Sequence, residues 1–178
     1  MAAARTVAQA RGYNGLNFRD LAATVGIKSA SIHYHFPTKA DLGAAVARRY
    51  WEDTAALLEA MSAETPEPVE CLRRYPGIFR RSLETGNRMC LGSFMAAEYD
   101  DLPDVVMAEV QTFADINVAW LEKLLVAGDL VSAEMRESRA RAIFAAIAGA
   151  QLMARSRSDI ALFDTVIEAY RAAGLLPG

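Results

Sequence analysis

The stretch "FRDLAATVGIKSASIHYHFPTKADL", from Phe18 to Leu42, interrupts an otherwise apolar, alanine-rich sequence. Within eight residues it places one lysine, two serines, two histidines and a tyrosine. Three arrangements are compatible with it: an ordinary solvated helix, a helix pair with a histidine-rich rim, or a surface shaped to enter a groove in DNA. The rest of the sequence decides between them.

The first half of this stretch has the pattern of a short helix that ends at a tight turn. Asn17 is a good N-cap, and Asp20 lies where a carboxylate favours the positive end of the helix dipole. Apolar side chains at i, i+3, i+4 and i+7 between Phe18 and Val25 form one stripe. Gly26 can adopt the left-handed conformation that ends a helix.

A second short helix is expected from near Ser29. On a helical wheel Ile32 and Phe36 point inward, whereas Ala30 and Tyr34 point outward. Two short helices that are joined by a glycine turn, with the second helix exposed, predict a helix-turn-helix.

The exposed face of the second helix suits the major groove of DNA. Ser29, Ala30 and Ser31 are short, so the backbone can approach the base edges. His33 and Tyr34 supply hydrogen-bonding groups and ring surface, which can meet base edges or a thymine methyl group. This favours the DNA-binding interpretation.

The following helix begins with a signature of its own. Phe36 precedes Pro37, and a residue before proline is disfavoured in the helical region. Thr38 and Asp41 then form a carboxylate variant of the capping box. Lys39 lies in the first turn, where its charge opposes the helix dipole, and a contact with a phosphate would compensate for this.

The segment "RGYNGLNFRDLAATVGIKSASIHYHFPTKADL" resembles the DNA-binding head of TetR-family transcriptional regulators, and the resemblance extends over residues 2–50. It implies an all-α fold, with a three-helix helix-turn-helix domain at residues 1–40 and a helical ligand-binding and dimerisation domain at residues 41–178. The partners that it implies are a double-stranded DNA operator, a second copy of the chain and a small-molecule effector. Repression is the usual mode in the family, and activation stays open.

The resemblance also assigns DNA contacts by position. It implies base and groove contacts by Arg19, Lys28, Ser29, Ala30, Ser31 and His33, and backbone contacts by Asn17, Tyr34, His35 and Lys39. Two departures stand out. The family often has tyrosine where this chain has His33, and the first helix is expected to be short and to lack the basic arm of many members.

Charge is distributed unevenly along the chain. Residues 1–50 contain seven basic and two acidic residues, a net charge of +5, whereas the remainder contains 12 basic and 20 acidic residues, a net charge of −8. A basic head on an acidic body is typical of a polyanion binder that has a separate second task. The overall net charge of −3 conceals this difference.

The rest of the chain reads as helices that are separated by breaks. Breaks are expected at residues 12–17, 65–68, 84–92, 99–103, 127–132 and 156–159, which gives about nine helices and no sheet. No apolar run reaches the roughly 18 residues of a membrane span, and no signal peptide is recognisable, so we expect a cytoplasmic protein with no membrane partner.

Aromatic and methionine residues gather in the central part of the chain. Packing in the core explains any one of them, but as a group they fit an adaptable apolar ligand site. The candidate ligand-binding residues are Phe79, Met89, Phe94, Met95, Tyr99, Phe113 and Trp120. We expect an uncharged or weakly polar, mostly apolar effector.

The last two helices predict a dimer interface. The segment from Ile143 to Leu152 is apolar or small on most sides, and a helix of that kind must be covered all round. A second subunit would provide the cover, in keeping with the family's usual four-helix dimer. The candidate dimerisation residues are Ile143, Phe144, Ile147, Gly149, Leu152, Phe163, Ile167 and Tyr170.

A redox sensor and an enzyme are the two alternative function classes. A redox sensor could use Cys90, because Arg88 is close in sequence and a nearby cation lowers the pKa of a thiol. An enzyme for small apolar substrates is disfavoured, since no nucleophile–base pair or glycine-rich phosphate loop is present. Cys71 and Cys90 are expected to be buried free thiols without metal-ligand spacing, and no cofactor or metal is expected.

Overall fold

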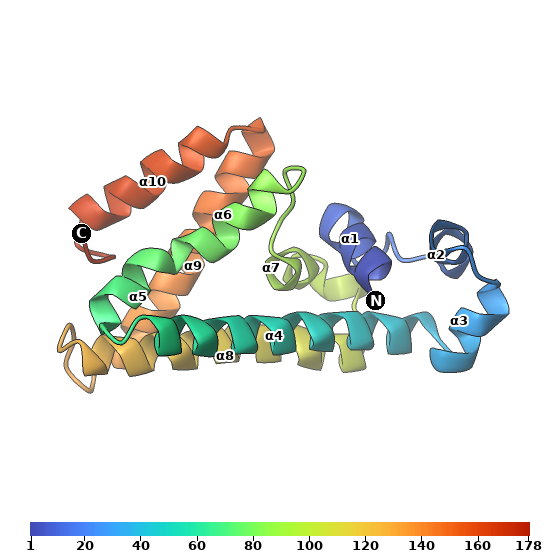
Figure 1. Ribbon diagram of the computed structural model, residues 1–178, viewed down its shortest axis with the longest axis horizontal. Helices are drawn as coiled ribbons and strands as arrows, with labels where there is room; N and C mark the ends of the chain where they lie inside the picture. The colour runs from blue at the N-terminus through green and yellow to red at the C-terminus, as the bar shows by residue number, and fades with distance from the viewer. The chain divides into compact units, whose positions relative to one another are not determined.

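The computed structural model describes residues 1–178, which form α-helices and one 3-10 turn and no strand (Figure 1). The elements are α1 (Ala2–Arg11), α2 (Phe18–Val25), α3 (Ser29–His35), α4 (Lys39–Glu64), α5 (Pro68–Arg74), α6 (Pro76–Glu84), α7 (Leu91–Ala96), η1 (Tyr99–Asp101), α8 (Asp104–Ala127), α9 (Arg136–Arg157) and α10 (Ile160–Ala172). The expected all-α fold is confirmed. One more helix than expected is present, because the chain divides into α5 and α6 at Tyr75–Pro76.

The chain forms two compact units, and each of the long helices α4 and α8 contributes to both. The first unit contains residues 1–53 and 90–113, and the second contains residues 54–89 and 114–178. The functional division after residue 40 that the sequence suggests stays a prediction. No helix combines the length and the apolar character needed to cross a membrane.

In the first unit, α1 packs against α2 and α7, and α2 packs against α3. Its core includes Leu21, Val46, Leu91, Met95 and Val106. The start of α4 is held to the start of α8 by polar contacts. The Arg48 guanidinium binds the Glu109 carboxylate and lowers the pKa of that carboxyl, and Trp51 Nε1 donates to the same group at 2.7 Å.

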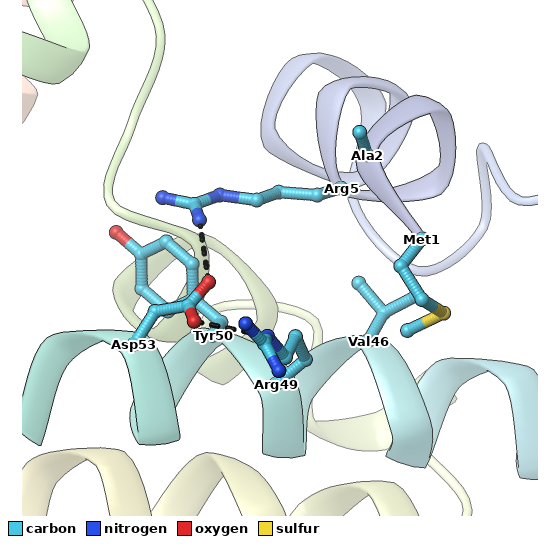
Figure 2. Close-up of a pocket in the computed structure, with 7 residues that line it drawn as sticks. All are labelled: Met1, Ala2, Arg5, Val46, Arg49, Tyr50 and Asp53. Atoms are coloured by element: carbon cyan, nitrogen blue, oxygen red, sulfur yellow. Dashed lines mark hydrogen bonds and ion pairs between the residues drawn. The ribbon is translucent and has the colours of Figure 1, made fainter. Parts of the chain in front are cut away.

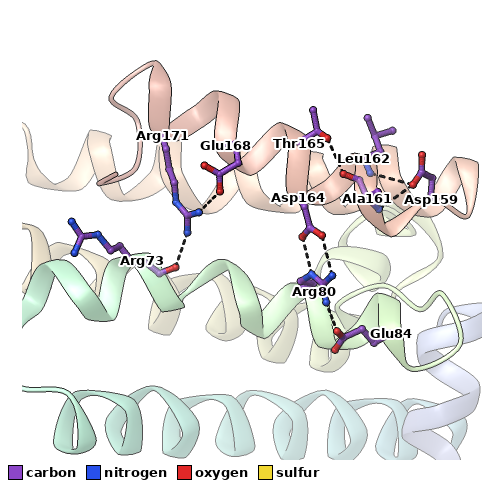
Figure 3. A network of polar contacts seen from close by, with 10 residues as sticks. All are labelled: Arg73, Arg80, Glu84, Asp159, Ala161, Leu162, Asp164, Thr165, Glu168 and Arg171. Carbon is purple, nitrogen blue, oxygen red and sulfur yellow. Dashed lines mark hydrogen bonds and ion pairs between the residues drawn. The ribbon is translucent and has the colours of Figure 1, made fainter.

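In the second unit, α6, α9 and α10 pack against one another. Its fully buried side chains include Tyr75, Phe79, Ile143 and Phe163. Polar groups tie α10 to α6 at the surface, where Arg80 makes two bonds to Asp164, at 2.7 and 2.9 Å (Figure 3).

Candidate DNA-binding site

The α2–turn–α3 unit has the capping that its sequence predicts. The Asn17 side chain accepts hydrogen bonds from the backbone N–H groups of Arg19 (2.8 Å) and Asp20 (3.2 Å). Gly26 has φ +72° and ψ +32°, the left-handed conformation in which a residue without Cβ is unstrained. The predicted apolar stripe of α2 is wrong at one end, because Val25 lies in the last turn and is 48% exposed.

Helix α3 is anchored by one residue and presents most of its other side chains to solvent. Ile32 is buried, as expected, while Tyr34 is 84% exposed. Of the predicted base and groove contacts, Ser29 is half-buried, and Arg19, Lys28, Ala30, Ser31 and His33 are exposed. The ring of His33 packs against the ring of Phe18 on α2, which fixes the orientation of α3 relative to α2.

The remaining predicted contacts lie around the same face. Asn17 and His35 are exposed. At the start of α4, Thr38 N–H donates to Asp41 at 2.9 Å and Asp41 N–H donates to the Thr38 hydroxyl at 3.1 Å, so the predicted capping box is confirmed. Lys39 Nζ donates to the carbonyl of Asn14 at 3.2 Å and keeps two donors for another partner.

The candidate ligand residues are divided between the two units. In the first unit Met95 is fully buried, Phe94 is half-buried, Tyr99 is 61% exposed, and the Phe113 ring lies 5.3 Å from that of Tyr50. In the second unit Phe79, Met89 and Trp120 are buried.

A buried polar pair accompanies the aromatic side chains of the second unit. The Tyr75 hydroxyl donates to Asn117 Oδ1 at 2.8 Å, and neither residue is exposed to solvent. The Tyr75 ring lies 5.4 Å from the ring of Trp120 and 5.6 Å from that of Phe79. The sequence does not indicate this pair, because 42 residues separate Tyr75 from Asn117.

The candidate dimerisation residues fall into two groups. Ile143, Ile147, Phe163 and Ile167 are buried inside the second unit, where α9 packs against α10 and α6. Gly149 and Leu152 are exposed, and Phe144 and Tyr170 are half-buried. An added Cβ at Gly149 would meet no atom within 4 Å, so this side of α9 is open.

A cavity of about 420 Å³ is lined by residues of α1 and α4, with Met1 before α1 (Figure 2). Three charged side chains line it, and Arg5 and Arg49 both bind Asp53, at 3.2 and 2.9 Å. The Arg5 guanidinium also lies 4.6 Å from the centre of the Tyr50 ring. Two arginines share one aspartate, so the charged side chains of the lining carry a net charge of +1.

The two cysteines are buried free thiols, as expected. Burial raises the pKa of the Cys90 thiol, although hydrogen bonds with Ser93 and Tyr50 lower it in part. No group of three or more His, Cys, Asp or Glu side chains could hold a metal ion.

The chain shares its head and its whole fold with known regulators. Residues 1–46 match the bacterial regulatory proteins of the tetR family. A TetR transcriptional regulator from Legionella pneumophila is 30% identical with a TM-score of 0.90, over 97% of this chain and 93% of that one. A TetR-family regulator from Agrobacterium tumefaciens is 30% identical with a TM-score of 0.86, over 93% and 90% of the two chains.

One further structure shares the fold at lower identity. The transcriptional regulator FadR from Bacillus subtilis, solved in complex with stearoyl-CoA, is 17% identical with a TM-score of 0.71, over 99% of this chain and 96% of that one. No curated protein sequence matches the chain. The identity and coverage of the Legionella and Agrobacterium regulators, together with the match of the head, show that the chain belongs to the TetR family of transcriptional regulators.

Proposed function

We propose that the protein is a cytoplasmic homodimeric repressor that binds a palindromic operator and is released from it by a small, mostly apolar effector. The observation that carries the DNA-binding part is α3, which Ile32 and the His33–Phe18 contact hold in place while Tyr34, Ser31 and Ala30 face solvent. The proposed DNA-binding domain is residues 1–40, and the proposed ligand-binding and dimerisation domain is residues 41–178.

The proposed base contacts are those of Arg19 and of the start of α3, and Lys39 is the proposed phosphate contact. A hydroxyl or an imidazole can bond to base edges, and a guanidinium can read guanine with two bonds. In a symmetric dimer the two copies of α3 would lie about 34–36 Å apart and so meet successive major grooves.

Dimerisation is supported by the open side of α9. Leu152 and Met153 are 57% and 48% exposed there, beside the uncovered Gly149. Exposed apolar and small residues on one helix face indicate an interaction surface, since solvent favours their burial. The four buried candidates pack inside the subunit and so hold α9 and α10 in place beneath this face: Ile143, Ile147, Phe163 and Ile167.

The effector proposal rests on the aromatic and methionine residues and on the buried Tyr75–Asn117 pair. The same fold accommodates stearoyl-CoA in FadR, a ligand whose stearoyl chain is apolar. An effector that favours one of two states by about 1–3 kcal/mol gives a typical allosteric response. The redox alternative through Cys90 has no support from the site, because burial raises the pKa of the thiol and only the thiolate is reactive.

The proposal is tested in two steps. First, duplexes are selected from a random pool on the purified protein, and sedimentation measures its oligomeric state at micromolar concentration. A palindromic consensus bound by a dimer is the expected result, whereas a monomer or the absence of any consensus would overturn the proposal.

Second, fatty acyl-CoA thioesters and uncharged apolar compounds are screened for release of the selected operator. The Phe94→Ala variant should respond less to an active compound while its operator affinity without the compound stays near that of the wild type. If no compound releases the operator, the effector assignment fails and the DNA-binding assignment stands.

A further inference from the structure

The loop that joins α1 to α2 receives a carboxylate from a distant part of the first unit. Tyr13 N–H donates to Glu98 Oε2 at 2.6 Å, and Asn14 N–H donates to Glu98 Oε1 at 3.4 Å. Each oxygen of the carboxylate therefore has its own backbone donor. Glu98 follows α7 directly and lies 85 residues from Tyr13 in the sequence.

Gly12 makes room for this carboxylate. Its φ is +69°, which side-chain-bearing residues rarely adopt, and a Cβ at this position would lie 2.2 Å from both Glu98 oxygens. Gly12 N–H completes the end of α1 by donating to the carbonyl of Ala8 at 2.8 Å. The next two N–H groups are left without helical partners, and these are the groups that Glu98 accepts from.

Two more charged residues hold the same loop. Asp101 in η1 accepts from the Asn14 side-chain amide at 2.7 Å. Lys39 at the start of α4 donates to the Asn14 carbonyl at 3.2 Å, and its ammonium lies 4.6 Å from the centre of the Tyr13 ring. The backbone and side chain of Asn14 are thus bonded to groups from both η1 and α4.

The loop leads directly into the DNA-binding helices. Asn17, the cap of α2, follows Asn14 by three residues, and Arg19 follows it by five. On the other side of the contact, Phe94 and Met95 of α7 precede Glu98 by four and three residues. A movement of α7 therefore carries the Glu98 carboxylate with it, and bonds to a charged acceptor are stronger than those between neutral groups.

We propose that Glu98 is a positioning residue for DNA binding: its carboxylate, held by the Tyr13 and Asn14 amides over Gly12, keeps the α1–α2 loop and the start of α2 in the operator-binding orientation. This inference rests on the proposed function, and it adds the route by which α7 acts on the head. Loss of the Glu98 contact lowers operator affinity without removing any group that touches DNA.

The test compares Glu98→Gln with Asp100→Asn. Both changes remove one negative charge from the same acidic segment, but Asp100 is exposed and has no bond to the loop. In Glu98→Gln an amide N–H₂ group replaces one of the two carboxylate oxygens, so the backbone N–H of Tyr13 or Asn14 faces a second donor instead of an acceptor. We expect Glu98→Gln to bind the selected operator about ten-fold more weakly at fixed salt, within the usual range of coupling between sites. Asp100→Asn should bind at least as tightly as the wild type.

Binding of both variants to a duplex of unrelated sequence separates positioning from lost charge contacts. Non-specific binding depends on phosphate neutralisation, so it should be equal in the two variants, which have the same net charge, and at least as tight as in the wild type. Thermal melting and sedimentation of Glu98→Gln establish that fold and dimer are retained. If the wild type selects an operator and Glu98→Gln binds that operator with the same affinity, Glu98 does not position the α1–α2 loop for DNA binding. A wild type that selects no operator would refute the proposed function itself.

Hydrogen exchange on the unaltered protein gives an answer even if Glu98→Gln fails to fold. The Tyr13 and Asn14 amides should exchange about ten-fold or more slowly than unprotected amides, both free and on the selected operator. Unprotected exchange of both amides in the operator complex would overturn the proposal.

Discussion

The imidazole of His33 and the phenyl ring of Phe18 lie with their centroids 4.2 Å apart and their planes inclined at 42°. His33 belongs to α3 and Phe18 to the first turn of α2, so this contact joins the proposed base-reading helix to the helix that precedes it. His33 therefore has two tasks, because its ring packs on Phe18 while its nitrogen atoms remain available at the exposed surface.

Substitution of His33 can separate these two tasks. We expect His33→Phe to keep the free energy of unfolding near that of the wild type, since the ring contact remains, while the base preference at one operator position is lost. His33→Ala should in addition lower the free energy of unfolding by about 0.5–1 kcal/mol, the size of an aromatic pair. Denaturant unfolding and binding to single-base operator variants measure the two effects. Equal unfolding of both variants would mean that the contact contributes nothing.

Arg19 and Lys39 should give different patterns of loss. Arg19→Ala is expected to relax the preference at particular base pairs by about 1–3 kcal/mol, because a base contact is removed. Lys39→Ala is expected to weaken binding to all sequences and to reduce the salt slope by about one unit, because a phosphate contact is removed. Titrations of specific and unrelated duplexes at several salt concentrations distinguish them. If both variants bind like the wild type, the proposed contacts are wrong.

Gly149→Glu should yield monomers that fold normally. A Cβ added at Gly149 meets no atom of its own subunit within 4 Å, so the substitution should disturb only the surface that a second subunit is proposed to cover. Gly77→Glu is the matched control, because Gly77 on α6 is also exposed and a Cβ added there also meets no atom within 4 Å. Sedimentation and operator titration are the measurements. A Gly149→Glu protein that stays dimeric would place the interface elsewhere.

The Arg80–Asp164 pair should make stability depend on pH in the acid range. The bonds from Arg80 lower the pKa of the Asp164 carboxyl below its usual value. A group with a depressed pKa stabilises the fold above its unfolded pKa of about 3.9, and this stabilisation is lost as the pH falls through the folded pKa. Both side chains are partly exposed, so Asp164→Asn should cost at most about 1 kcal/mol at pH 7. Denaturant titrations at the lowest pH should give Asp164→Asn and the wild type the same free energy of unfolding. Operator affinity should not change. If Asp164→Asn lowers the free energy of unfolding by the same amount at every pH, the lost stability does not come from the ion pair.

Cys90 is expected to react slowly with iodoacetamide in the native protein. Its thiol is buried and its pKa is raised, so little thiolate is present or accessible near neutral pH. Peptide mapping by mass spectrometry, with and without denaturant, measures the reaction. Rapid alkylation of Cys90 alone, with loss of operator binding, would instead favour the redox sensor.

Local signals predicted the head well. Asn17, Gly26 and the Thr38–Asp41 pair act through bonds to residues at most four positions away, so their roles can be inferred from spacing alone. The inward position of Ile32 and the outward position of Tyr34 follow from helical periodicity in the same way.

Contacts between distant residues could not be predicted. Neither the spacing nor the type of Glu98 indicates that it binds the loop after Gly12, because the acceptor is a side chain and the donors are backbone groups common to every sequence. The dimer prediction has a related difficulty. An apolar pattern marks Ile143 and Ile147 as covered, but it does not say whether the cover comes from the same subunit, and here α6 and α10 provide it.

The bond between Glu98 and the α1–α2 loop is made to main-chain atoms, and only Gly12 is demanded by its geometry. The exposed residues of α3 that are proposed to contact bases take no part in it. Operator preference can therefore be exchanged by grafting a new α3 surface onto this scaffold, while the junction between head and α7 is left intact. For the construction of biosensors, the recognition surface and the junction that orients it are separable parts of one small unit.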